Sequence, residues 1–375
     1  MRLVRSAAFI LAALSLIGAY GCASNQSTAV APQPAVAPVP PPPPPPPAIL
    51  QIVVAADGTG QFTTVQSAID SINVKTPVEI HIKPGTYKES IVFPRALPPT
   101  RIWGDDAATT VLTFNRQANQ LGPDGKKIGT FRTASVVVQA NDFEADQITF
   151  ENSTPRDISQ ALAISCVGDR QIYRHCRFLG WQDTIYTNGG PGPGPLTTAP
   201  SLPAATEPVP VVPPANRLYF EDSYIEGGVD FIFGNSTAVF NRCEIHSKRK
   251  GYLTAASTTR GVLYGYVFMN CKLTAEPDVK DGSVYLGRPW RGYANVTYLN
   301  CIMGPQISPA GWSIWKSAPE RIFTVLYNEY NSTGPGASPS TRVKWSHQLT
   351  AAQAAAITIP AVLAGDDNWD PKPTP

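Results

Sequence analysis

Residues 173–178, Tyr-Arg-His-Cys-Arg-Phe, are the first of five segments that share one pattern. An aromatic residue is followed three positions later by a small residue, and two positions after that by an apolar one. The other segments with this pattern are 220–225, 240–245, 268–273 and 298–303. Short β-rich segments that recur at coil-length spacing are typical of a solenoid whose turns stack on one another. The pattern therefore predicts an all-β fold, a parallel β-helix.

The same pattern accounts for most of the cysteines. Apart from Cys22 the chain has five, and four of them stand at the small position of a repeat: Cys176, Cys243, Cys271 and Cys301. An odd number leaves at least one thiol unpaired. Free cysteine is among the most often buried residue types. We expect buried thiols in the stack, with no disulfide framework.

Two of the repeats are followed by an acidic residue at the same distance. Asp183 lies in Gly-Trp-Gln-Asp-Thr (180–184), and Asp230 lies in the apolar stretch Gly-Val-Asp-Phe-Ile-Phe-Gly (228–234). Each follows the small residue of its repeat by seven positions (183 − 176 = 7; 230 − 223 = 7). Stacked strands lie about 4.7–4.9 Å apart, so the two carboxyl groups should meet on neighbouring coils.

Two close carboxylates cannot both ionise cheaply, and their pKa values should separate. This would give one proton donor and one ionised nucleophile or base. Asp230 alone could equally be a structural carboxylate held by backbone N–H groups or an arginine.

Composition excludes several classes of protein. The chain has 375 residues, a formal net charge of +2 and 15% charged residues, so no basic excess points to nucleic acid. There is no C-x-x-C spacing and no G-x-S-x-G, and the four histidines form no helix-spaced pair. The sequence offers neither a zinc site nor a Ser-His-Asp arrangement.

The first residues resemble an export signal. Residues 1–22 combine Arg2 and Arg5 with an apolar core too short to span a membrane comfortably, and they end in a lipoprotein-like box at Cys22. We expect lipidation of Cys22 and, with Ala23 after it, an outer-membrane anchor. Ordinary cleavage, with a periplasmic or secreted product, is the alternative.

Composition divides the rest of the chain into a linker, a domain and a loop inserted in that domain. Residues 23–48 are a Pro/Ala-rich linker, either a polyproline II spacer or a disordered one. Residues 49–375 are the β-helix domain. Within it, 189–215 is Gly/Pro-rich and reads as an inserted surface loop.

Two short helices and a tail are expected around the β-helix. The apolar spacing of 64–72 predicts a helix with Thr64 as N-cap, suited to covering an open end of the solenoid. Residues 350–357 are a second short helix, 143–150 read as a single β-rich segment, and 366–375 read as a tail.

With these residues in view, the chain resembles the pectinesterase (pectin methylesterase) family. The matching motifs, in the family's order, are 85–89 (GTYKE), 160–163 (QALA), 180–184 (GWQDT), 228–234 (GVDFIFG) and 286–290 (LGRPW). The resemblance implies a right-handed parallel β-helix that hydrolyses methyl esters of the galacturonate units of pectin. It implies no metal or organic cofactor. We expect methyl-esterified homogalacturonan as the partner, no nucleic acid, and a monomer.

The resemblance also assigns roles to residues. Asp230 matches the nucleophile, and Asp183 matches the acid that protonates departing methanol and then acts as base. Gln182 and Gln160 match the donors that stabilise the oxyanion, and Arg288 matches the guanidinium that orients the nucleophile. Thr130, Phe233 and Trp290 match sugar-contacting positions, and Gln160 and Arg288 also touch substrate. The motif at 85–89 is more simply a structural turn, with Tyr87 a core aromatic.

The chain departs from the family pattern in three places. Ser223 stands where many relatives have a cysteine that pairs with the one matching Cys243. Trp181 replaces a common tyrosine, and the loop 189–215 is longer than usual. Two alternative functions stay open: an esterase or thioesterase on the same scaffold with a non-pectin substrate, and a non-catalytic carbohydrate-binding β-helix.

Overall fold

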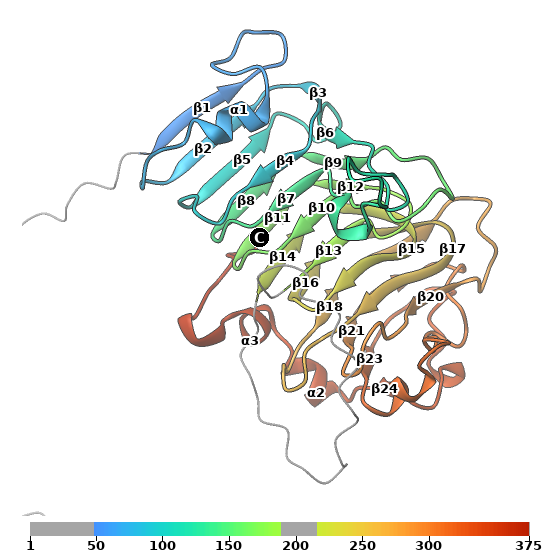
Figure 1. Cartoon of the computed structure of the whole chain (residues 1–375). Helices are drawn as coiled ribbons and strands as arrows, with labels where there is room; N and C mark the ends of the chain where they lie inside the picture. The colour runs from blue at the N-terminus through green and yellow to red at the C-terminus, as the bar shows by residue number, and fades with distance from the viewer. Residues whose placement is uncertain (1–48, 189–215, 375) are drawn as a thin grey trace, which may run out of the picture. The chain divides into compact units, whose positions relative to one another are not determined.

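The protein folds as a right-handed parallel β-helix, seen in a computed structural model that describes residues 49–188 and 216–374 (Figure 1). The first sheet has eleven strands in one parallel row. They are β1 (Leu50–Val54), β2 (Val78–Ile82), β5 (Thr100–Gly104), β8 (Phe143–Asp146), β11 (Gln171–Arg174), β14 (Arg217–Glu221), β16 (Thr237–Asn241), β18 (Tyr266–Met269), β21 (Asn295–Leu299), β23 (Leu326–Tyr330) and β24 (His347–Gln348). Parallel pairing between successive coils is the arrangement that the repeats predict, so the fold class is confirmed.

The second sheet has two rows of strands that join at two long ones, β15 (Tyr224–Gly234) and β17 (Glu244–Ala256). One row contains β3 (Gly85–Lys88), β6 (Thr110–Phe114), β9 (Thr149–Asn152), β12 (Arg177–Leu179), β19 (Lys272–Ala275) and β22 (Ile302–Met303). The other contains β4 (Ile91–Phe93), β7 (Val136–Val138), β10 (Ile164–Cys166), β13 (Ile185–Thr187) and β20 (Val284–Gly287). Since β15 pairs with β12 near its start and with β13 near its end, it turns the corner between the rows.

A left-handed residue ends the strand in seven successive coils of the first sheet. These residues have φ between 47° and 56° and directly follow β8, β11, β14, β16, β18, β21 and β23: Gln147, His175, Asp222, Arg242, Asn270, Asn300 and Asn331. Asn, Asp and His enter this region more readily than other non-glycine residues. In the five coils that carry the repeat, the residue after it is the small one of the repeat, which begins the turn into the second sheet.

One expectation from the sequence is wrong at this corner. Residues 143–150 are two strands, β8 and β9, rather than one segment, because the backbone of Gln147 turns at φ 54° between them. Apolar and polar residues alternate on both sides of Gln147, so the sequence pattern gives no sign of the turn.

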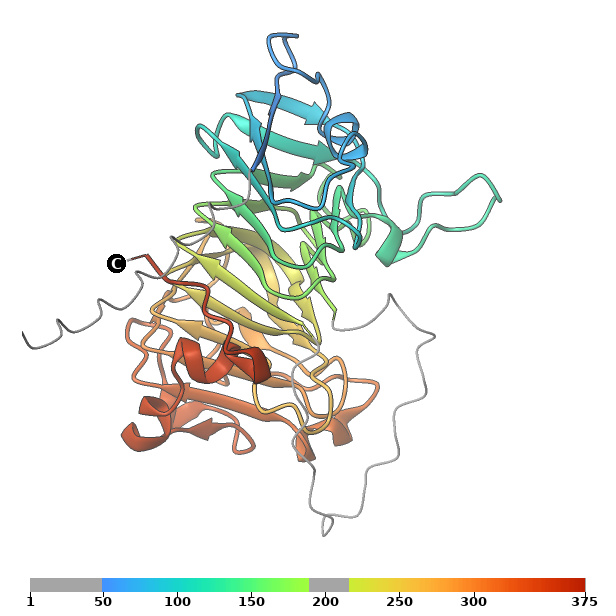
Figure 2. The ribbon, with the colours of Figure 1, turned by 90° about the vertical axis from the view of Figure 1, so that its left-hand side faces the viewer.

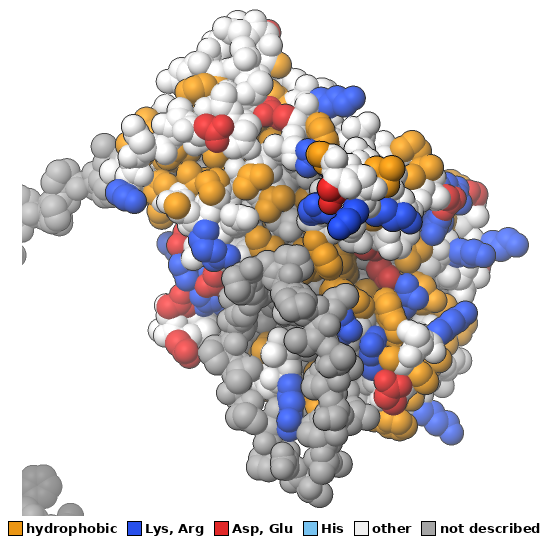
Figure 3. Space-filling model, in the orientation of Figure 1, with side chains coloured by type: hydrophobic (Ala, Val, Ile, Leu, Met, Phe, Trp, Pro, Cys, Tyr) orange, Lys and Arg blue, Asp and Glu red, His pale blue; other side chains and the backbone are white. Residues whose placement is uncertain are grey.

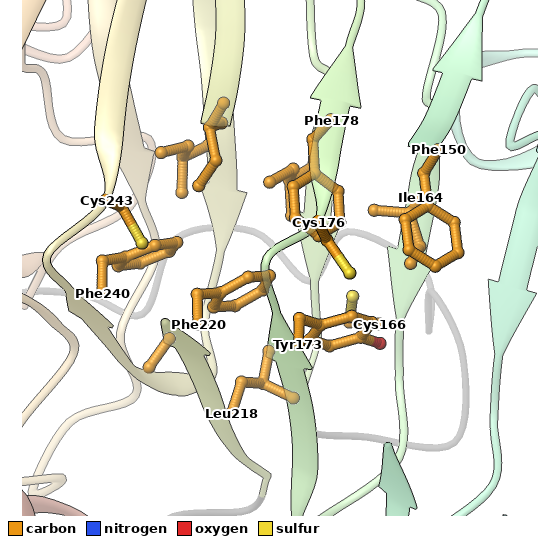
Figure 4. Packing of buried hydrophobic residues seen from close by; sticks show 14 of the residues in the cluster. Phe150, Ile164, Cys166, Tyr173, Cys176, Phe178, Leu218, Phe220, Phe240 and Cys243 are labelled. Atoms are coloured by element: carbon orange, nitrogen blue, oxygen red, sulfur yellow. The ribbon is translucent and has the colours of Figure 1, made fainter. Parts of the chain in front are cut away.

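The repeat residues form a stack in the core, the ladder. Successive rings lie 4.4–4.9 Å apart and nearly parallel, in the order Tyr173, Phe220, Phe240, Phe268 and Tyr298. Figure 4 shows the first three of them, with Cys176 and Cys243 beside the rings. All five cysteines that the structure describes are buried and unpaired, as expected. Burial raises the pKa of the Cys166 thiol to about 12 and also raises that of Cys271.

Ser223 takes the place of a thiol in this stack. Its hydroxyl donates to the carbonyl of Glu221 at 2.9 Å and accepts from the N–H of Cys176 at 3.1 Å. The buried hydroxyl thus has partners on its own coil and on the preceding one. Cys243, on the next coil, is a free thiol, as the absence of a cysteine at 223 implies.

Helix α1 (Val65–Asp70) covers the first coils of the solenoid. Thr64 is its N-cap, as predicted, and Val65, Ala68 and Ile69 are buried in the core. The carboxylate of Glu89 accepts from the N–H groups of Val65 and Gln66 at 2.8 and 3.0 Å. The 85–89 motif is therefore structural, since it fixes this helix N-terminus.

Helices α2 (Ala351–Ala355) and α3 (Ile359–Leu363) pack on the outer face of the first sheet (Figure 2). Thr350 caps α2 in a capping box with Gln353, which confirms the helix expected at 350–357.

The residues that follow are not a free tail. Arg174 donates to the carbonyl of Pro371, and the N–H of Thr374 donates to Glu221 at 3.0 Å. The expectation of a tail over 366–375 is wrong for its described part because buried charges on the sheet hold it. The short 3₁₀ turns are η1 (Thr130–Arg132), η2 (Pro319–Phe323), η3 (Pro339–Thr341) and η4 (Gly365–Asp367).

The signal, linker and loop of the sequence analysis, 1–22, 23–48 and 189–215, lie outside the described residues. The strands on either side of the loop still test its spacing. Arg177 pairs with Tyr224, 47 positions on (224 − 177 = 47), and Tyr224 pairs with Glu244, 20 positions on (244 − 224 = 20). Without the 27 residues 189–215 the first value would also be 20 (47 − 27 = 20). The domain boundaries stay predictions.

Candidate active site

Asp183 and Asp230 occupy the same corner of neighbouring coils. Paired residues on the two coils are 47 positions apart in the sequence on both sides of the corner. Arg177 pairs with Tyr224 before it, and Ile185 pairs with Ile232 after it. The same offset relates the two acids (230 − 183 = 47), and the N–H of Asp183 donates to the carbonyl of Val229 at 3.1 Å. The alignment read from the sequence is therefore confirmed.

Both acids have left-handed backbone conformations at this corner. The φ angles are 63° for Asp183 and 50° for Asp230, and the register of β15 shifts on both sides of Val229. The N–H of Gly228 donates to the carbonyl of Trp181 at 2.5 Å, which ties the two coils together just before the acids. Sparsely populated backbone conformations of this kind cluster at functional sites. The side chains remain buried, with 8% of Asp183 and 6% of Asp230 exposed.

Arg288, which follows β20, holds Asp230 with two hydrogen bonds. Its Nε and Nη2 atoms lie 2.9 and 2.6 Å from the two carboxylate oxygens. The guanidinium stacks between two rings, 4.0 Å from the centre of Tyr252 and 4.4 Å from that of Trp315. A bidentate pair of this kind fixes the orientation of a carboxylate as well as its charge.

The electrostatics of the two acids differ. Burial, and next the charge of Asp230, holds the pKa of Asp183 well above its ordinary value. Burial also raises the pKa of Asp230, but the hydrogen bonds and charge of Arg288 oppose this rise. The arrangement therefore favours a protonated Asp183 beside an ionised Asp230. A pair in these states can supply one proton and one nucleophile.

Two glutamines flank the acids on neighbouring coils. Gln182 directly precedes Asp183, and its backbone carbonyl accepts from the N–H of Ala161 at 3.1 Å, which places Gln160 on the adjacent coil. Both side chains are half-buried. The hydroxyl of Ser159 donates to Oε1 of Gln160 at 2.9 Å. The amide NH₂ of Gln160 is thereby left to donate elsewhere, for example to an oxyanion.

Aromatic residues border the carboxylates. Phe233 lies three positions after Asp230, and its ring centre is 4.9 Å from that of Tyr186 and 5.6 Å from that of Trp290. Phe131 packs 4.8 Å from Tyr186 and follows Thr130, the first residue of η1. The structure thus brings the predicted Phe233 and Trp290 together and places Thr130 at the edge of the same cluster.

Comparison with known proteins decides the family. A family model described as Pectinesterase matches residues 51–190 and 212–366, most of the chain. The chain belongs to the pectinesterase family. It is therefore a carboxylic ester hydrolase that removes methyl esters from pectin.

Plant pectinesterases are similar in sequence over most of the chain. Pectinesterase 31 of Arabidopsis thaliana is 37% identical over 303 residues, which cover 79% of this chain and 86% of that protein. Pectinesterase QRT1 of the same plant is 36% identical over 310 residues, covering 80% and 73%.

Solved pectin methylesterases share the fold. The carrot enzyme superposes with a TM-score of 0.71 at 30% identity, over 84% of this chain and 93% of the carrot chain. PemA of Erwinia chrysanthemi gives a TM-score of 0.68 at 29% identity, over 86% and 98%. Another solved pectin methylesterase is in complex with a hexasaccharide.

The sequence alone missed four aromatic residues of this pectinesterase site. Tyr186 could have been found, because it follows Asp183 by three positions as Phe233 follows Asp230, and the two pair in the structure. Phe131, Tyr252 and Trp315 lie on other coils and loops, where no repeat marks them. Arg321 was also missed; it donates to the carbonyl of Trp290 at 2.6 Å.

Neither a metal site nor a spanning helix is found in the part of the enzyme that the structure describes. Over 49–188 and 216–374, no group of three or more His, Cys, Asp or Glu side chains could hold a metal ion. In the same ranges no helix is long and apolar enough to cross a membrane. That the enzyme uses no cofactor stays a prediction from the family resemblance.

Proposed function

We propose that this pectinesterase hydrolyses galacturonate methyl esters with Asp230 as the nucleophile and Asp183 as the acid and then the base. The observation that carries the assignment is the asymmetry of the pair. Arg288 binds both oxygens of Asp230, which favours its ionised form, while burial and the neighbouring charge favour a protonated Asp183. Two carboxyl groups with opposed protonation states are suited to acid and base roles.

The first half of the reaction forms a covalent intermediate. One oxygen of Asp230 attacks the ester carbonyl carbon, and the carbonyl oxygen becomes an oxyanion. The amide N–H groups of Gln160 and Gln182 donate to that oxyanion. Asp183 then gives its proton to the methoxy oxygen, the C–O bond to it breaks, and methanol leaves an anhydride between galacturonate and Asp230.

The second half restores the enzyme. Asp183, now ionised, takes a proton from a water molecule, whose oxygen attacks the carbonyl carbon of the galacturonyl group. The anhydride bond breaks, and the carboxylate of Asp230 returns to Arg288. The product is one galacturonic acid group, which releases its proton to solvent and becomes a carboxylate, and Asp183 is again protonated, so protons and charge balance over the cycle.

The aromatic cluster and the residues around it hold the polymer. Trp290 is half-buried and packs on the buried ring of Phe233, so it offers an apolar face on which sugar rings stack. Thr130, Gln160 and Arg288 supply polar contacts. Their common position beside the acids supports this role. Arg321 acts on Trp290 only through its backbone carbonyl.

Release of methanol from methylated pectin tests the assignment. The wild-type enzyme is expected to release it, and Gln182→Ala is expected to lose about 10²–10³-fold in kcat, the usual effect of removing one oxyanion donor. Turnover of an acyl thioester without methanol release from pectin would instead favour a different esterase. Binding of pectin with no turnover of either would favour a non-catalytic protein.

We also propose that the chain is a bacterial lipoprotein-type member of the family, anchored in the outer membrane through Cys22. The export-like residues 1–22 and the proline-rich linker 23–48 support this. The wild-type enzyme is expected in the membrane fraction, and Cys22→Ser in the soluble fraction. A soluble wild-type protein whose N-terminus lies after Cys22 would contradict the anchor. We further propose that the enzyme is a monomer, which its sedimentation would test.

A further inference from the structure

Trp181 stands directly before Gln182, one of the two proposed oxyanion donors, and its backbone is fixed to the neighbouring coil. Its carbonyl accepts from the N–H of Gly228 at 2.5 Å and from that of Val229 at 3.3 Å. Gln182 itself pairs with Val229 in a parallel bridge. The coil that carries Asp230 therefore holds the backbone from which the amide side chain of Gln182 projects.

The half-buried ring of Trp181 is held by a cation. Nζ of Lys248, on β17, lies 3.9 Å from the ring centre, and it donates to Oε1 of Glu226, on β15, at 2.6 Å. Only 15% of the Lys248 side chain and 13% of the Glu226 side chain are exposed. A cation over an indole face is attracted more strongly when it is shielded from water. Figure 3 shows Lys, Arg, acidic and hydrophobic side chains close together over the region of β15 and β17.

Glu226 anchors this lysine and also holds the residue that follows the acid Asp183. Its second carboxylate oxygen accepts from the hydroxyl of Tyr224 at 3.1 Å, and its backbone carbonyl accepts from the hydroxyl of Thr184 at 2.9 Å. Burial and the charge of Glu226 raise the pKa of Tyr224, which keeps this hydroxyl protonated. Glu226 therefore contacts the segment after Asp183 directly and the segment before it through the lysine.

The amide of Gln182 depends on these contacts for its direction. Within residues 49–188 and 216–374 its side chain makes no hydrogen bond, whereas that of Gln160 accepts from Ser159. An oxyanion donor must lie about 2.7–3.1 Å from the place where the oxyanion forms. A misplacement of about 1 Å costs roughly 10²-fold in rate. The direction of this amide is therefore set by whatever fixes the backbone beside it.

We propose that Trp181 is a positioning residue, on whose ring Lys248 and Glu226 form a clamp that keeps the amide of Gln182 aimed at the oxyanion. The proposal rests on the function proposed above, since that function gives Gln182 its role. Trp181 acts through Gln182 and not on the sugar. When the clamp is released, pectin still binds, but the transition state loses part of its stabilisation. The expected signature is a lower kcat with an unchanged KM.

Initial-rate kinetics on methylated pectin test the clamp. Lys248→Met keeps the aliphatic stem but removes the cation, and kcat is expected to fall about tenfold. This is less than the loss in Gln182→Ala, because Arg156 still lies 5.4 Å from the ring centre. Lys248→Arg keeps the cation and should restore most of the activity. The matched control is Lys272→Met, which removes an exposed lysine from the next coil, and its kcat should equal that of the wild type.

A double-mutant cycle separates positioning from a general effect on the fold. In the Gln182→Ala background the amide is already gone, so Lys248→Met should reduce kcat no further. An equal fold loss in both backgrounds would overturn the proposal, and so would a rise in KM without a fall in kcat. Thermal melts show whether each variant is folded, and Lys248→Gln takes the place of Lys248→Met if the latter is not.

The two proposals fail in different ways. Wild-type kcat in Gln182→Ala would contradict the proposed function, and the clamp with it. Wild-type kcat in Lys248→Met beside a slow Gln182→Ala would contradict the clamp alone.

Discussion

Two of the solenoid's corners, each with left-handed residues, serve different ends. At the first corner, between the two sheets, one such residue follows the strand in each of seven coils. The side chains there are mostly exposed and pair with one another, as Asn331 does with Asn300 at 2.9 Å and Arg242 with Asp222 at 2.7 Å. At the second corner, between β12 and β13 and within β15, the left-handed residues are Asp183 and Asp230, and both are buried.

The difference separates backbone geometry from chemistry. The same φ near 50–60° occurs at both corners, so the left-handed backbone does not by itself make a site. What distinguishes the second corner is burial of two carboxyl groups beside one guanidinium. The aspartate at the first corner, Asp222, is exposed and pairs with Arg242. Substitutions at the two corners should therefore have separable effects.

The largest effect is expected from Asp230→Asn, which removes the nucleophile. Methanol release should fall by at least about 10³-fold, as for other enzymes that lose their nucleophile. The matched control is Asp222→Asn, an acid with a similar φ (47°) at the first corner, and asparagine tolerates this conformation. Its turnover should stay close to wild type. Similar losses in the two variants would mean that the corner, not the carboxylate, matters.

Asp183→Asn should cost about 10²–10⁴-fold in kcat, because general acid–base catalysis contributes that much. Pectin binding should be retained, since asparagine keeps the size of the side chain. The double variant with Asp230→Asn should be little slower than Asp230→Asn alone, because both groups serve one reaction. Additive losses, or near wild-type turnover in either single variant, would contradict the mechanism.

A smaller effect, on stability alone, is expected at the first corner from Asn270→Val. A β-branched residue at φ 56° should cost about 1–2 kcal/mol of unfolding free energy. Asn270→Gly relieves the steric conflict and is expected to be closer to wild type. Thermal melts would show the order of the three proteins, while kcat on pectin should not change. A stable valine variant would mean that the left-handed turns are dispensable.

The smallest effects are the shifts in stability at the second corner, and their signs should differ. The pKa of Asp183 is raised, so the folded state holds its proton better than the unfolded chain does. This contribution is complete below the ordinary aspartate pKa and is lost as pH rises through the folded value. Asparagine cannot ionise. Asp183→Asn should therefore have a higher Tm than wild type near pH 8, by about 3 °C, and no advantage near pH 3.

Asp230→Asn should instead lower the Tm near neutral pH, because it leaves the half-buried Arg288 without its carboxylate. Melting curves of the two variants and the wild type from pH 3 to pH 8 test both signs. A lower Tm for Asp183→Asn at pH 8, or a higher one for Asp230→Asn, would reverse the assignment of charge.

The sequence predicted the parts of the fold that repeat. The ladder from Tyr173 to Tyr298 was visible because an aromatic and a small residue recur with fixed spacing, and Asp183 and Asp230 were aligned by the same spacing. The turn at Gln147 and the docked segment after Asp366 were not predicted. Their positions depend on tertiary contacts, such as those of Arg174 and Glu221, which leave no periodic signal.

The sequence predicted the site residues that lie in motifs and missed those that lie in loops. The five motifs contain the two acids, the two glutamines, Arg288, Phe233 and Trp290. They do not contain Thr130, Tyr186, Phe131 or the two rings that stack on Arg288. Tyr252 lies where the register between β15 and β17 changes. Tyr224 pairs with Glu244, 20 positions on, whereas Val229 pairs with Tyr252, 23 positions on (252 − 229 = 23). Trp315 comes from a loop after the last repeat. Neither residue stands at a position that recurs with the repeat, so pattern analysis could not reach them.

The protonation states of the two acids are the centre of this account, and carbon NMR of carboxyl-labelled aspartate measures them directly. Titration of the wild type and the two Asn variants would assign each resonance by its loss. We expect the resonance missing from Asp183→Asn to titrate far above an ordinary aspartate, and the one missing from Asp230→Asn to ionise at lower pH. Ordinary titration of Asp183, or an acid at 230 that keeps its proton to higher pH than the one at 183, would contradict it.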